Sequence, residues 1–351
     1  MDKQILASFQ GKSYLKEIDF TPEQLKAVVE FGQAIKVAEQ NQTLQPFLKG
    51  KNVILLFAKN STRTRLAFEL GAQEMGANTV FLDPTSSQFG KKESVADTAH
   101  VLAGVADGIA YRGFAQADIE EMAADAYDTR GKHAPVWNAL SDQWHPTQMI
   151  ADFMTLQSEF GQLDNQITLA YVGDGRNNVA RSLLVAGAMV GINVNIIAPQ
   201  SLQPDQDTVK LAQEYAQAAG SQILITDDLD QGAADANVFY SDVFVSMGEN
   251  NWQERLEALM PYQINETLLQ KSKHYGHDLI TMHCLPAYHD NQTQVAQDLH
   301  KEYPDLVGNT GIEMSDAVFK GAQARHFQQA ENRKPSIMAI MAATLGNLEL
   351  L

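Results

Sequence analysis

The chain reads Val53-Ile54-Leu55-Leu56-Phe57, then Ser61-Thr62-Arg63-Thr64-Arg65, and then a helical apolar pattern over residues 66–76. A short continuous apolar run of this kind is typical of a strand that is buried on both faces. The polar loop that follows contains helix-starting residue types, and the next residues repeat their apolar positions with helical spacing. The stretch therefore predicts a strand, a short loop and a helix, which is the basic unit of an α/β domain.

The loop of this unit is also suited to binding an anion. Free backbone N–H groups and the helix dipole favour negative charge at a helix start. The hydroxyls of Ser61 and Thr62 can donate to phosphate oxygens, and the guanidinium groups of Arg63 and Arg65 match phosphate geometry. The pattern predicts a phosphate-bearing substrate, and the alternative is an ordinary Ser/Thr helix cap beside solvated arginines.

Strand and helix patterns alternate along most of the chain. Such alternation indicates parallel sheets that helices cover on both faces. We therefore predict an α/β fold of two doubly wound parallel-sheet domains joined by interdomain helices. The predicted strands cover residues 52–57, 79–82, 108–111, 167–172, 193–197, 222–225, 237–240 and 279–282, and helices are expected over residues 22–39, 95–106, 179–190 and 205–219, among others.

The domain boundary is expected near a break in the pattern at residues 160–165, between a long helix that begins near Pro146 and a fresh strand. Residues 1–151 are predicted to form the first domain and residues 152–331 the second. The C-terminal helix, residues 332–351, is expected to pack back on the first domain. Pro335 is a residue favoured in a first helical turn, so this helix is expected to begin near residue 334.

Composition and charge narrow the classes of partner. The chain has 351 residues, of which 44% are hydrophobic, and its formal charge is 26 − 43 = −17. Such a charge argues against nonspecific binding to nucleic acid or to anionic membranes. Cys284 is the only cysteine, which excludes an intrachain disulfide and a multi-cysteine metal site. Without a signal-peptide pattern or an apolar run of membrane-spanning length, we expect a cytoplasmic protein.

A second loop after a strand is Gly173-Asp174-Gly175-Arg176-Asn177-Asn178. The dinucleotide fingerprint needs a third glycine where Asn178 stands, and the next strand ends in Ala198-Pro199 without an acidic residue. This argues against nicotinamide binding, and we expect no cofactor. Asn177 and Asn178 are candidates either for capping the following helix or for contacting a substrate at the carboxyl end of the strand.

Other polar groups follow predicted strands or begin a helix. Asp242 and Cys284 come after neighbouring strands, so a carboxylate and a thiol are expected to face one site. Taken alone, Cys284 also fits a small buried hydrophobe and Asp242 a cap. The segment His145-Pro146-Thr147-Gln148 has the pattern of a helix start. The nine histidines show no metal-ligand spacing such as HExxH, so no catalytic metal is predicted.

Together these segments resemble the aspartate/ornithine carbamoyltransferase family, in its order of motifs and over nearly the whole chain. The Ser61–Arg65 loop is similar to the family's carbamoyl phosphate loop, and His145–Gln148 to its second such segment. His283-Cys284-Leu285-Pro286 and Asp242 with Ser246-Met247-Gly248 resemble signatures of the ornithine branch. The resemblance implies transfer of the carbamoyl group from carbamoyl phosphate to the δ-amine of ornithine, giving citrulline and phosphate.

The resemblance also implies roles for individual residues. Those expected to be catalytic are Arg112, His145, Asp242 and Cys284. Those expected to bind carbamoyl phosphate are Ser61, Thr62, Arg63, Thr64, Gln88, Arg112, His145, Pro146, Thr147, Gln148, Cys284, Leu285 and Arg333. Those expected to bind ornithine are Asn178, Asp242, Ser246 and Met247. The family further implies a homotrimer, or an assembly of trimers, in which Gln88 contacts the site of the adjacent subunit.

Competing functions remain at this stage. An aspartate acceptor would need a basic site for its second carboxylate, whereas this loop offers Asp242, Ser246 and Glu249, which suit an amine. Putrescine carbamoyl transfer is the main alternative, although the Ser-Met-Gly pattern favours the ornithine branch. A catalytically silent phosphate-binding subunit is a further alternative, but it would be expected to have lost part of this set of residues.

Overall fold

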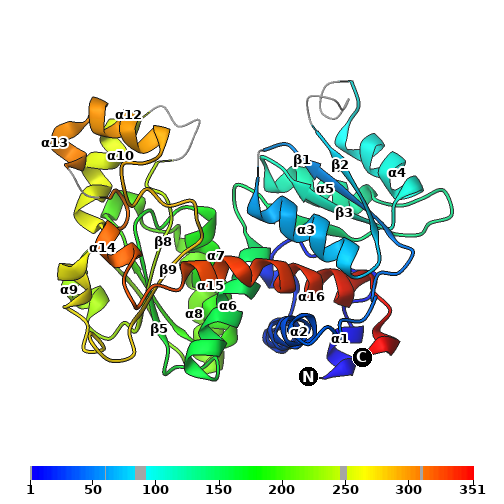
Figure 1. Cartoon of the computed structure of the whole chain (residues 1–351), viewed down its shortest axis with the longest axis horizontal. Coiled ribbons are helices and arrows are strands. Elements are labelled where there is room, and N and C mark those ends of the chain that lie inside the picture. Colours follow the sequence, from blue (N-terminus) through cyan, green and yellow to red (C-terminus); the bar gives the residue numbers. More distant parts are fainter. Residues whose placement is uncertain (1, 60, 84–91, 246–250, 309–310) are drawn as a thin grey trace. The chain divides into compact units, whose positions relative to one another are not determined.

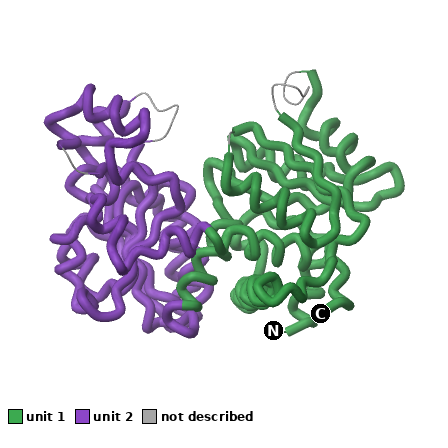
Figure 2. Tube along the Cα trace, in the orientation of Figure 1, with its two compact units in different colours: residues 1–158, 331–351 green, residues 159–330 purple. Residues whose placement is uncertain are grey.

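The computed structural model describes residues 2–59, 61–83, 92–245, 251–308 and 311–351. The chain forms two compact units, residues 1–158 with 331–351 and residues 159–330, shown in green and purple in Figure 2. The predicted domains, residues 1–151 with 332–351 for carbamoyl phosphate and residues 152–331 for ornithine, were defined by the substrate each binds, and they remain a prediction.

The sheet of the first unit is parallel, with strand order β2-β1-β3-β4. All but the first residue of β1 are buried, as expected for an apolar strand covered on both faces. Ile54 and Leu56 pack in a core with residues of α4 and α5. The strands are β1 (Asn52–Phe57), β2 (Asn78–Leu82), β3 (Gly108–Arg112) and β4 (Val136–Leu140).

Strand β4 was not among the predicted strands. Its sequence, Val-Trp-Asn-Ala-Leu, carries a polar residue at its centre, which interrupts the apolar run. Asn138 is nevertheless fully buried, because its Nδ2 donates to the carbonyl of Leu15 at 2.7 Å and to Oε1 of Gln116 at 3.2 Å. A buried amide with partners of this kind is compatible with a core strand.

The helix Arg333–Leu345, α16, belongs to the first unit and lies against α2 and α3 (Figure 1). It begins two residues before Pro335 and ends at Leu345, six residues before the predicted end, with Gly346 as its C-cap. The other helices of this unit are α1 (Lys3–Ala7), α2 (Pro22–Gln40), α3 (Arg63–Glu74), α4 (Val95–Val105), α5 (Gln116–Asp125) and α6 (Pro146–Phe160), with 3₁₀ turns at Glu17–Asp19 and Leu348–Leu350.

The sheet of the second unit is also parallel, with strand order β7-β6-β5-β8-β9. Its strands are β5 (Thr168–Val172), β6 (Asn193–Ile197), β7 (Ile223–Thr226), β8 (Val238–Ser241) and β9 (Ile280–His283). Its helices are α7 (Asn178–Val190), α8 (Gln206–Ala219), α9 (Leu229–Ala233), α10 (Trp252–Leu259), α11 (Glu266–Leu269), α12 (Gln294–Glu302), α13 (Pro304–Val307), α14 (Asp316–Phe319) and α15 (His326–Glu331), with 3₁₀ turns at Gln200–Leu202 and Met260–Tyr262. The predicted fold class is confirmed.

The strand orders place a topological switch point in each sheet. In the first, the chain moves from β1 to β2 on one side and then crosses to β3 on the other. In the second, the same reversal occurs between β5 and β8. Open α/β sheets bind ligands at the carboxyl ends of strands at such points. The loops after β1, β3, β5 and β8 are therefore the places where the predicted site residues should be sought. In the described ranges, no helix combines the length and apolar character needed to cross a bilayer.

Candidate functional site

The loop after β1 leads directly into α3, as the sequence indicated. Thr62 is the N-cap residue of this helix, yet within the described residues its side chain makes no capping hydrogen bond. Arg63 and Thr64 are the first two residues of the helix, where backbone N–H groups have no partner within the helix. This arrangement supports an anion site more than the ordinary-cap alternative, because the hydroxyl is not used as a cap.

Arg65 has a different role from the one that the loop pattern suggested. Its Nε lies 3.1 Å from Oε2 of Glu69, one helical turn further on. Its guanidinium also stacks over the ring of Phe81, 3.6 Å from the ring centroid. These contacts hold Arg65 against the side of its own helix and β2, so it contributes to local packing and is not a candidate phosphate ligand.

Arg333 enters the same part of the first unit from a distant point in the sequence. It is the first residue of α16, and only 3% of its surface is exposed. Its Nη2 donates to Oγ1 of Thr64 and to Oγ1 of Thr147, each at 3.2 Å. The start of α3, the start of α6 and the start of α16 are thereby linked by one buried guanidinium group.

Arg112 is the last residue of β3, which pairs with β1 in the sheet. Its carbonyl oxygen accepts a hydrogen bond from the backbone N–H of Ala58, just after β1, at 2.8 Å. Burial, with the charge of Arg63 nearby, lowers the pKa of Arg112 to about 10. The group is therefore still charged at neutral pH. Among the described residues, its buried Nε has no hydrogen-bond partner. A buried cationic donor without a protein partner indicates a site for an anionic or strongly polar ligand.

His145 immediately precedes α6 and is 6% exposed. Burial lowers its pKa well below the usual value, and the charges of Arg333, Arg112 and Arg63 act in the same direction. The imidazole is therefore neutral at physiological pH. A neutral imidazole can donate one hydrogen bond to a carbonyl oxygen without adding a further positive charge. Thr147 and Gln148, in the first turn of the same helix, are also buried.

Asp242 and Cys284 meet in the second unit, as the sequence predicted. Asp242 follows β8 and Cys284 follows β9, and these strands are neighbours. The thiol Sγ lies 3.0 Å from Oδ1 of Asp242 and donates to it, and the same oxygen accepts from the backbone N–H of Val243 at 2.8 Å. Burial raises the pKa of Asp242, while His283 and the bond from Cys284 oppose the rise.

The loop after β5 separates the roles of its two asparagines. Asn177 caps α7, since its side-chain oxygen accepts from the N–H of Ala180 at 2.7 Å. Its Nδ2 donates to the hydroxyl of Tyr171 at 2.6 Å and reaches Oδ2 of Asp242 at 3.5 Å. The capping role therefore belongs to Asn177, which leaves Asn178, the first residue of the helix, as the candidate for substrate contact. Asn177 also orients the carboxylate of Asp242.

His283 and Glu313 form a buried pair behind Cys284 that sequence reasoning did not single out. Both side chains are fully buried, and Nε2 of His283 lies 3.3 Å from Oε1 of Glu313. Nδ1 of His283 accepts from the backbone N–H of Leu285 at 2.9 Å. Leu285 has a positive φ of 57°, unusual for a residue with a side chain. The pair thus supports a sharp turn directly after Cys284.

Three of the predicted site residues, Gln88, Ser246 and Met247, lie outside the described residues. The others divide between the units. Ser61, Thr62, Arg63, Thr64, Arg112, His145, Pro146, Thr147, Gln148 and Arg333 belong to the first, and Asn178, Asp242, Cys284 and Leu285 to the second. Residues predicted to bind carbamoyl phosphate lie in the first unit, and residues predicted to bind ornithine lie in the second. Cys284 and Leu285 are the exceptions, because they lie in the second unit but were expected to contact carbamoyl phosphate.

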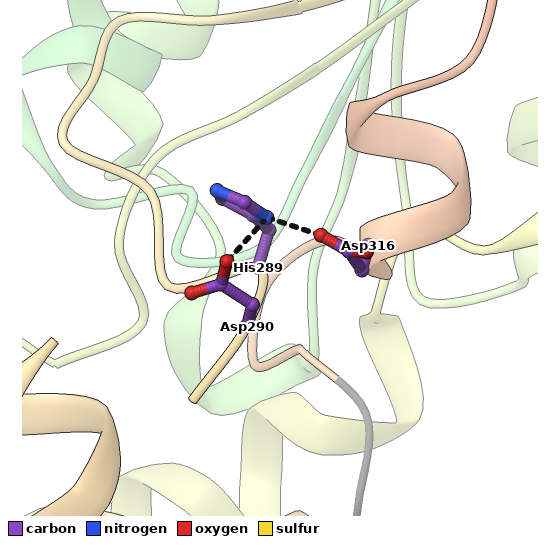
Figure 3. Close-up of side chains that lie close together, drawn as sticks. All are labelled: His289, Asp290 and Asp316. Carbon is purple, nitrogen blue, oxygen red and sulfur yellow. Dashed lines mark hydrogen bonds and ion pairs between the residues drawn. The ribbon is translucent and has the colours of Figure 1, made fainter. Parts of the chain in front are cut away.

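One group of side chains in the described part of the chain is compact enough to be considered as a metal site. It consists of His289, Asp290 and Asp316, whose ligand atoms lie within 4.8 Å of one another (Figure 3). Nδ1 of His289 is 2.7 Å from Oδ1 of Asp316, and the ammonium of Lys320 lies 2.8 Å from the same oxygen. Lys320 already neutralises Asp316, so these contacts are read as structural. They hold the loop after Cys284 against α14.

The ring of His289 stacks on Phe319, with 3.7 Å between centroids, and the other face of Phe319 is close to His326 at 4.0 Å. His326 is fully buried and donates from Nε2 to the carbonyl of Phe319 at 2.7 Å. Burial lowers the pKa of His326 to about 4. Because the unfolded chain binds this proton near pH 6.5, stability that is present at neutral pH is lost as the pH falls from about 6.5 toward 4.

The predicted consequence concerns the variant His326→Gln, which keeps a donor for the carbonyl of Phe319. In the unchanged chain, this one group should lower the free energy of unfolding by about 2 kcal/mol between pH 7 and pH 5. The variant should lose that part of the pH dependence, as measured by urea unfolding at both pH values. His277→Gln, at an exposed histidine of the same unit, is the control. Equal pH dependence in the unchanged chain and His326→Gln would contradict the assignment.

Comparison with known proteins adds to this geometry. Residues 12–158 match the family model "Aspartate/ornithine carbamoyltransferase, carbamoyl-P binding domain", and residues 165–344 match "Aspartate/ornithine carbamoyltransferase, Asp/Orn binding domain". The chain is 49% identical over 340 residues to "Ornithine carbamoyltransferase" of Levilactobacillus brevis, covering 97% of this chain and 96% of that protein. It is also 49% identical over 341 residues to "Ornithine carbamoyltransferase, catabolic" of Enterococcus faecalis, covering 97% of each.

A solved structure agrees with these sequence matches. The ornithine carbamoyltransferase from Pyrococcus furiosus superposes with a TM-score of 0.84 at 32% identity, covering 96% of this chain and 98% of that one. The likeness therefore extends over both units and is not limited to the motifs around the candidate site.

Proposed function

This chain belongs to the aspartate/ornithine carbamoyltransferase family, and on that basis we propose that it transfers the carbamoyl group of carbamoyl phosphate to the δ-amine of L-ornithine. The products are L-citrulline and phosphate. The observation that carries the choice of acceptor is the contact between Asp242, which follows β8 at the switch point of the second sheet, and Cys284, which follows the neighbouring strand β9. A carboxylate there attracts an amine and repels the second carboxylate of aspartate.

The first unit supplies the groups for the donor substrate. The hydroxyls of Ser61 and Thr62, with Arg63 and the N–H groups at the start of α3, bind the phosphate. Thr64, Arg112 and His145 donate to the carbonyl oxygen of the carbamoyl group, and Gln148 accepts from its nitrogen. Arg333 holds the hydroxyls of Thr64 and Thr147 in position.

The reaction proceeds by direct attack of the amine on the carbonyl carbon. Negative charge develops on the carbonyl oxygen, and donors already aimed at that oxygen stabilise the transition state. Phosphate leaves with the electrons of the broken C–O bond and can accept the proton released by the amine, so a covalent enzyme intermediate is not required. Holding both substrates in reactive geometry supplies much of the acceleration. The attacking amine must be neutral, whereas free alkyl amines are mostly protonated near pH 7.

In the second unit, Asp242 binds and orients the δ-amine, and Cys284 is a polar neighbour that fixes the carboxylate by donating to Oδ1. Asn178, Ser246 and Met247 hold the α-amine and α-carboxylate of ornithine. The buried pair His283–Glu313 supports the turn that carries Cys284 and Leu285. Catabolic relatives support a role in arginine breakdown, in which citrulline and phosphate are converted to ornithine and carbamoyl phosphate.

The active assembly is a homotrimer, in which the Gln88 segment of one subunit completes the site of its neighbour. An exposed apolar face in the first unit supports contact between copies. Leu66 and Leu70 lie one turn apart on α3, and Val80 lies on the adjoining strand β2; all three are exposed in the single chain. An apolar face of this kind favours burial in an interface. The mass in solution, measured by light scattering, distinguishes a trimer from a larger multiple of three.

The function is tested by steady-state assays with carbamoyl phosphate and three acceptors: ornithine, putrescine and aspartate. We expect kcat/KM for ornithine to exceed that for putrescine by about 1,000-fold or more, since a site built to pair polar groups rejects an analogue that lacks them. The reverse reaction, from citrulline and phosphate, should also be measurable. A higher kcat/KM with putrescine, or activity with no acceptor, would overturn the proposal.

A further inference from the structure

The helix α6 carries two buried polar side chains one turn apart, Gln148 and Asp152. Residues four apart lie on the same face of a helix and can touch. Here Nε2 of Gln148 donates to Oδ1 of Asp152 at 2.7 Å. Gln148 is 3% exposed and Asp152 is fully buried.

The residues next to Asp152 along the helix are apolar. The neighbouring residues Ile150, Ala151, Phe153 and Met154 are all buried and apolar. Placing a carboxylate among such residues is costly unless it is hydrogen-bonded, so an apolar residue would be the simpler choice for stability alone. The bond to Gln148 is one contact that compensates this cost.

The orientation of Gln148 depends on the chemistry of the amide group. A glutamine side chain has a donor end and an acceptor end of almost the same shape, and only its partners decide which end points where. An ionised carboxylate can only accept hydrogen bonds. In the structure the NH₂ end of Gln148 faces Asp152, which turns the carbonyl oxygen Oε1 away from Asp152 as an acceptor for another group.

We propose that Asp152 is a positioning residue that fixes the amide of Gln148, so that Oε1 accepts from the NH₂ group of the carbamoyl donor. The pair thereby selects a carbamoyl phosphate over an acyl phosphate that carries a methyl group at the same place. A methyl group offers no donor, and its binding would leave the buried carbonyl oxygen unsatisfied. This inference rests on the proposed function, specifically on Gln148 as the contact to the carbamoyl nitrogen.

The test compares Asp152→Leu, Gln148→Leu and the double variant with the unchanged enzyme. Two affinities are measured: KM for carbamoyl phosphate, and the inhibition constant of acetyl phosphate as a competitor. In Asp152→Leu we expect KM to rise by about 100-fold, the loss typical of a misplaced contact. The inhibition constant of acetyl phosphate should stay within about twofold of its original value, because the phosphate contacts are unchanged. A purely structural role would weaken both ligands together.

Two further comparisons separate positioning from general damage. If Asp152 acts through Gln148, KM for carbamoyl phosphate in the double variant should be no higher than in Gln148→Leu alone. The effects of the two substitutions would then be non-additive. Asp152→Asn keeps an acceptor oxygen at the same place and should restore KM to within about tenfold. As a matched control, Thr344→Val removes a buried acceptor of the first unit, which takes a bond from Nε1 of Trp137 at 2.8 Å, and should leave the ratio of the two affinities unchanged.

Parallel weakening of both ligands, or additive effects in the double variant, would overturn the inference. An unchanged KM in Asp152→Leu would also overturn it, while the activity of the unchanged enzyme would still support the proposed function. If the unchanged enzyme does not use carbamoyl phosphate at all, the proposed function itself fails. The two failures are thus distinguishable within one set of measurements.

Discussion

Replacing Arg112 by alanine is expected to lower kcat by about 100- to 1,000-fold, the loss typical when one donor to a developing oxyanion is removed. The guanidinium is charged at neutral pH, partly buried at the end of β3, and its Nε has no partner among the described residues. We have assigned it to the carbonyl oxygen of the carbamoyl group, where charge is greatest in the transition state. Steady-state kinetics with saturating ornithine measures the effect.

The companion variants test the reason for the loss. Arg112→Lys keeps the charge but not the planar fork, and should retain an intermediate activity. Arg130→Ala removes an exposed arginine of the same unit that pairs only locally with Asp128, and should leave kcat within about twofold. If Arg112→Ala raises KM for carbamoyl phosphate while kcat is unchanged, the residue contributes to ground-state binding and the assignment to the transition state is wrong.

Replacing Asp242 by asparagine should have the second large effect, a fall in kcat/KM for ornithine of about 1,000-fold or more. Removing one charge from a buried charge pair typically costs about 3–5 kcal/mol, which corresponds to such a factor. KM for carbamoyl phosphate should change little, because the groups proposed to hold its phosphate and its carbonyl oxygen lie in the first unit. The measurement is kcat/KM for ornithine together with KM for carbamoyl phosphate.

The pH profile gives an independent check on Asp242. Burial raises the pKa of this carboxyl, so the ionised form that attracts the amine is lost at a higher pH than for an ordinary aspartate. The decline in kcat/KM on the acid side should therefore be shallower in Asp242→Asn, which has no such group to protonate. Asp278→Asn, at an exposed aspartate of the same unit, is the control. An unaltered profile and an unaltered kcat/KM in Asp242→Asn would exclude it as the amine-binding residue.

Sequence patterns identified much of this fold because most of its parallel strands are buried on both faces. All eight predicted strands are present, and the short apolar runs made them recognisable. The ninth, β4, was missed because Asn138 interrupts its apolar run. The groups that make Asn138 acceptable in the core, the carbonyl of Leu15 and the side chain of Gln116, become its neighbours only in the folded chain.

In the predicted site, too, contacts made only by folding could not be read from the sequence. The loop pattern treated Arg63 and Arg65 alike, and only the family resemblance named Arg63 alone as a ligand. The structure separates them, because Arg65 is held by Glu69 and Phe81. Glu313 gave no local signal either, since it lies far along the chain from His283 and contacts it only through folding.

The sequence by itself determined the order of strands and helices, the anion-binding loop at Ser61–Arg65 and the residue types that face each switch point. These features depend on neighbours along the chain: apolar spacing, loop residues and helix starts. Tertiary structure decided which of those residues meet. Arg333 reaches Thr64 and Thr147, and Cys284 reaches Asp242, because parallel strands and helix starts bring distant segments together. The physical reason is that burial and hydrogen-bond partners are properties of the packed chain, and they set the charge, orientation and accessibility on which the chemistry depends.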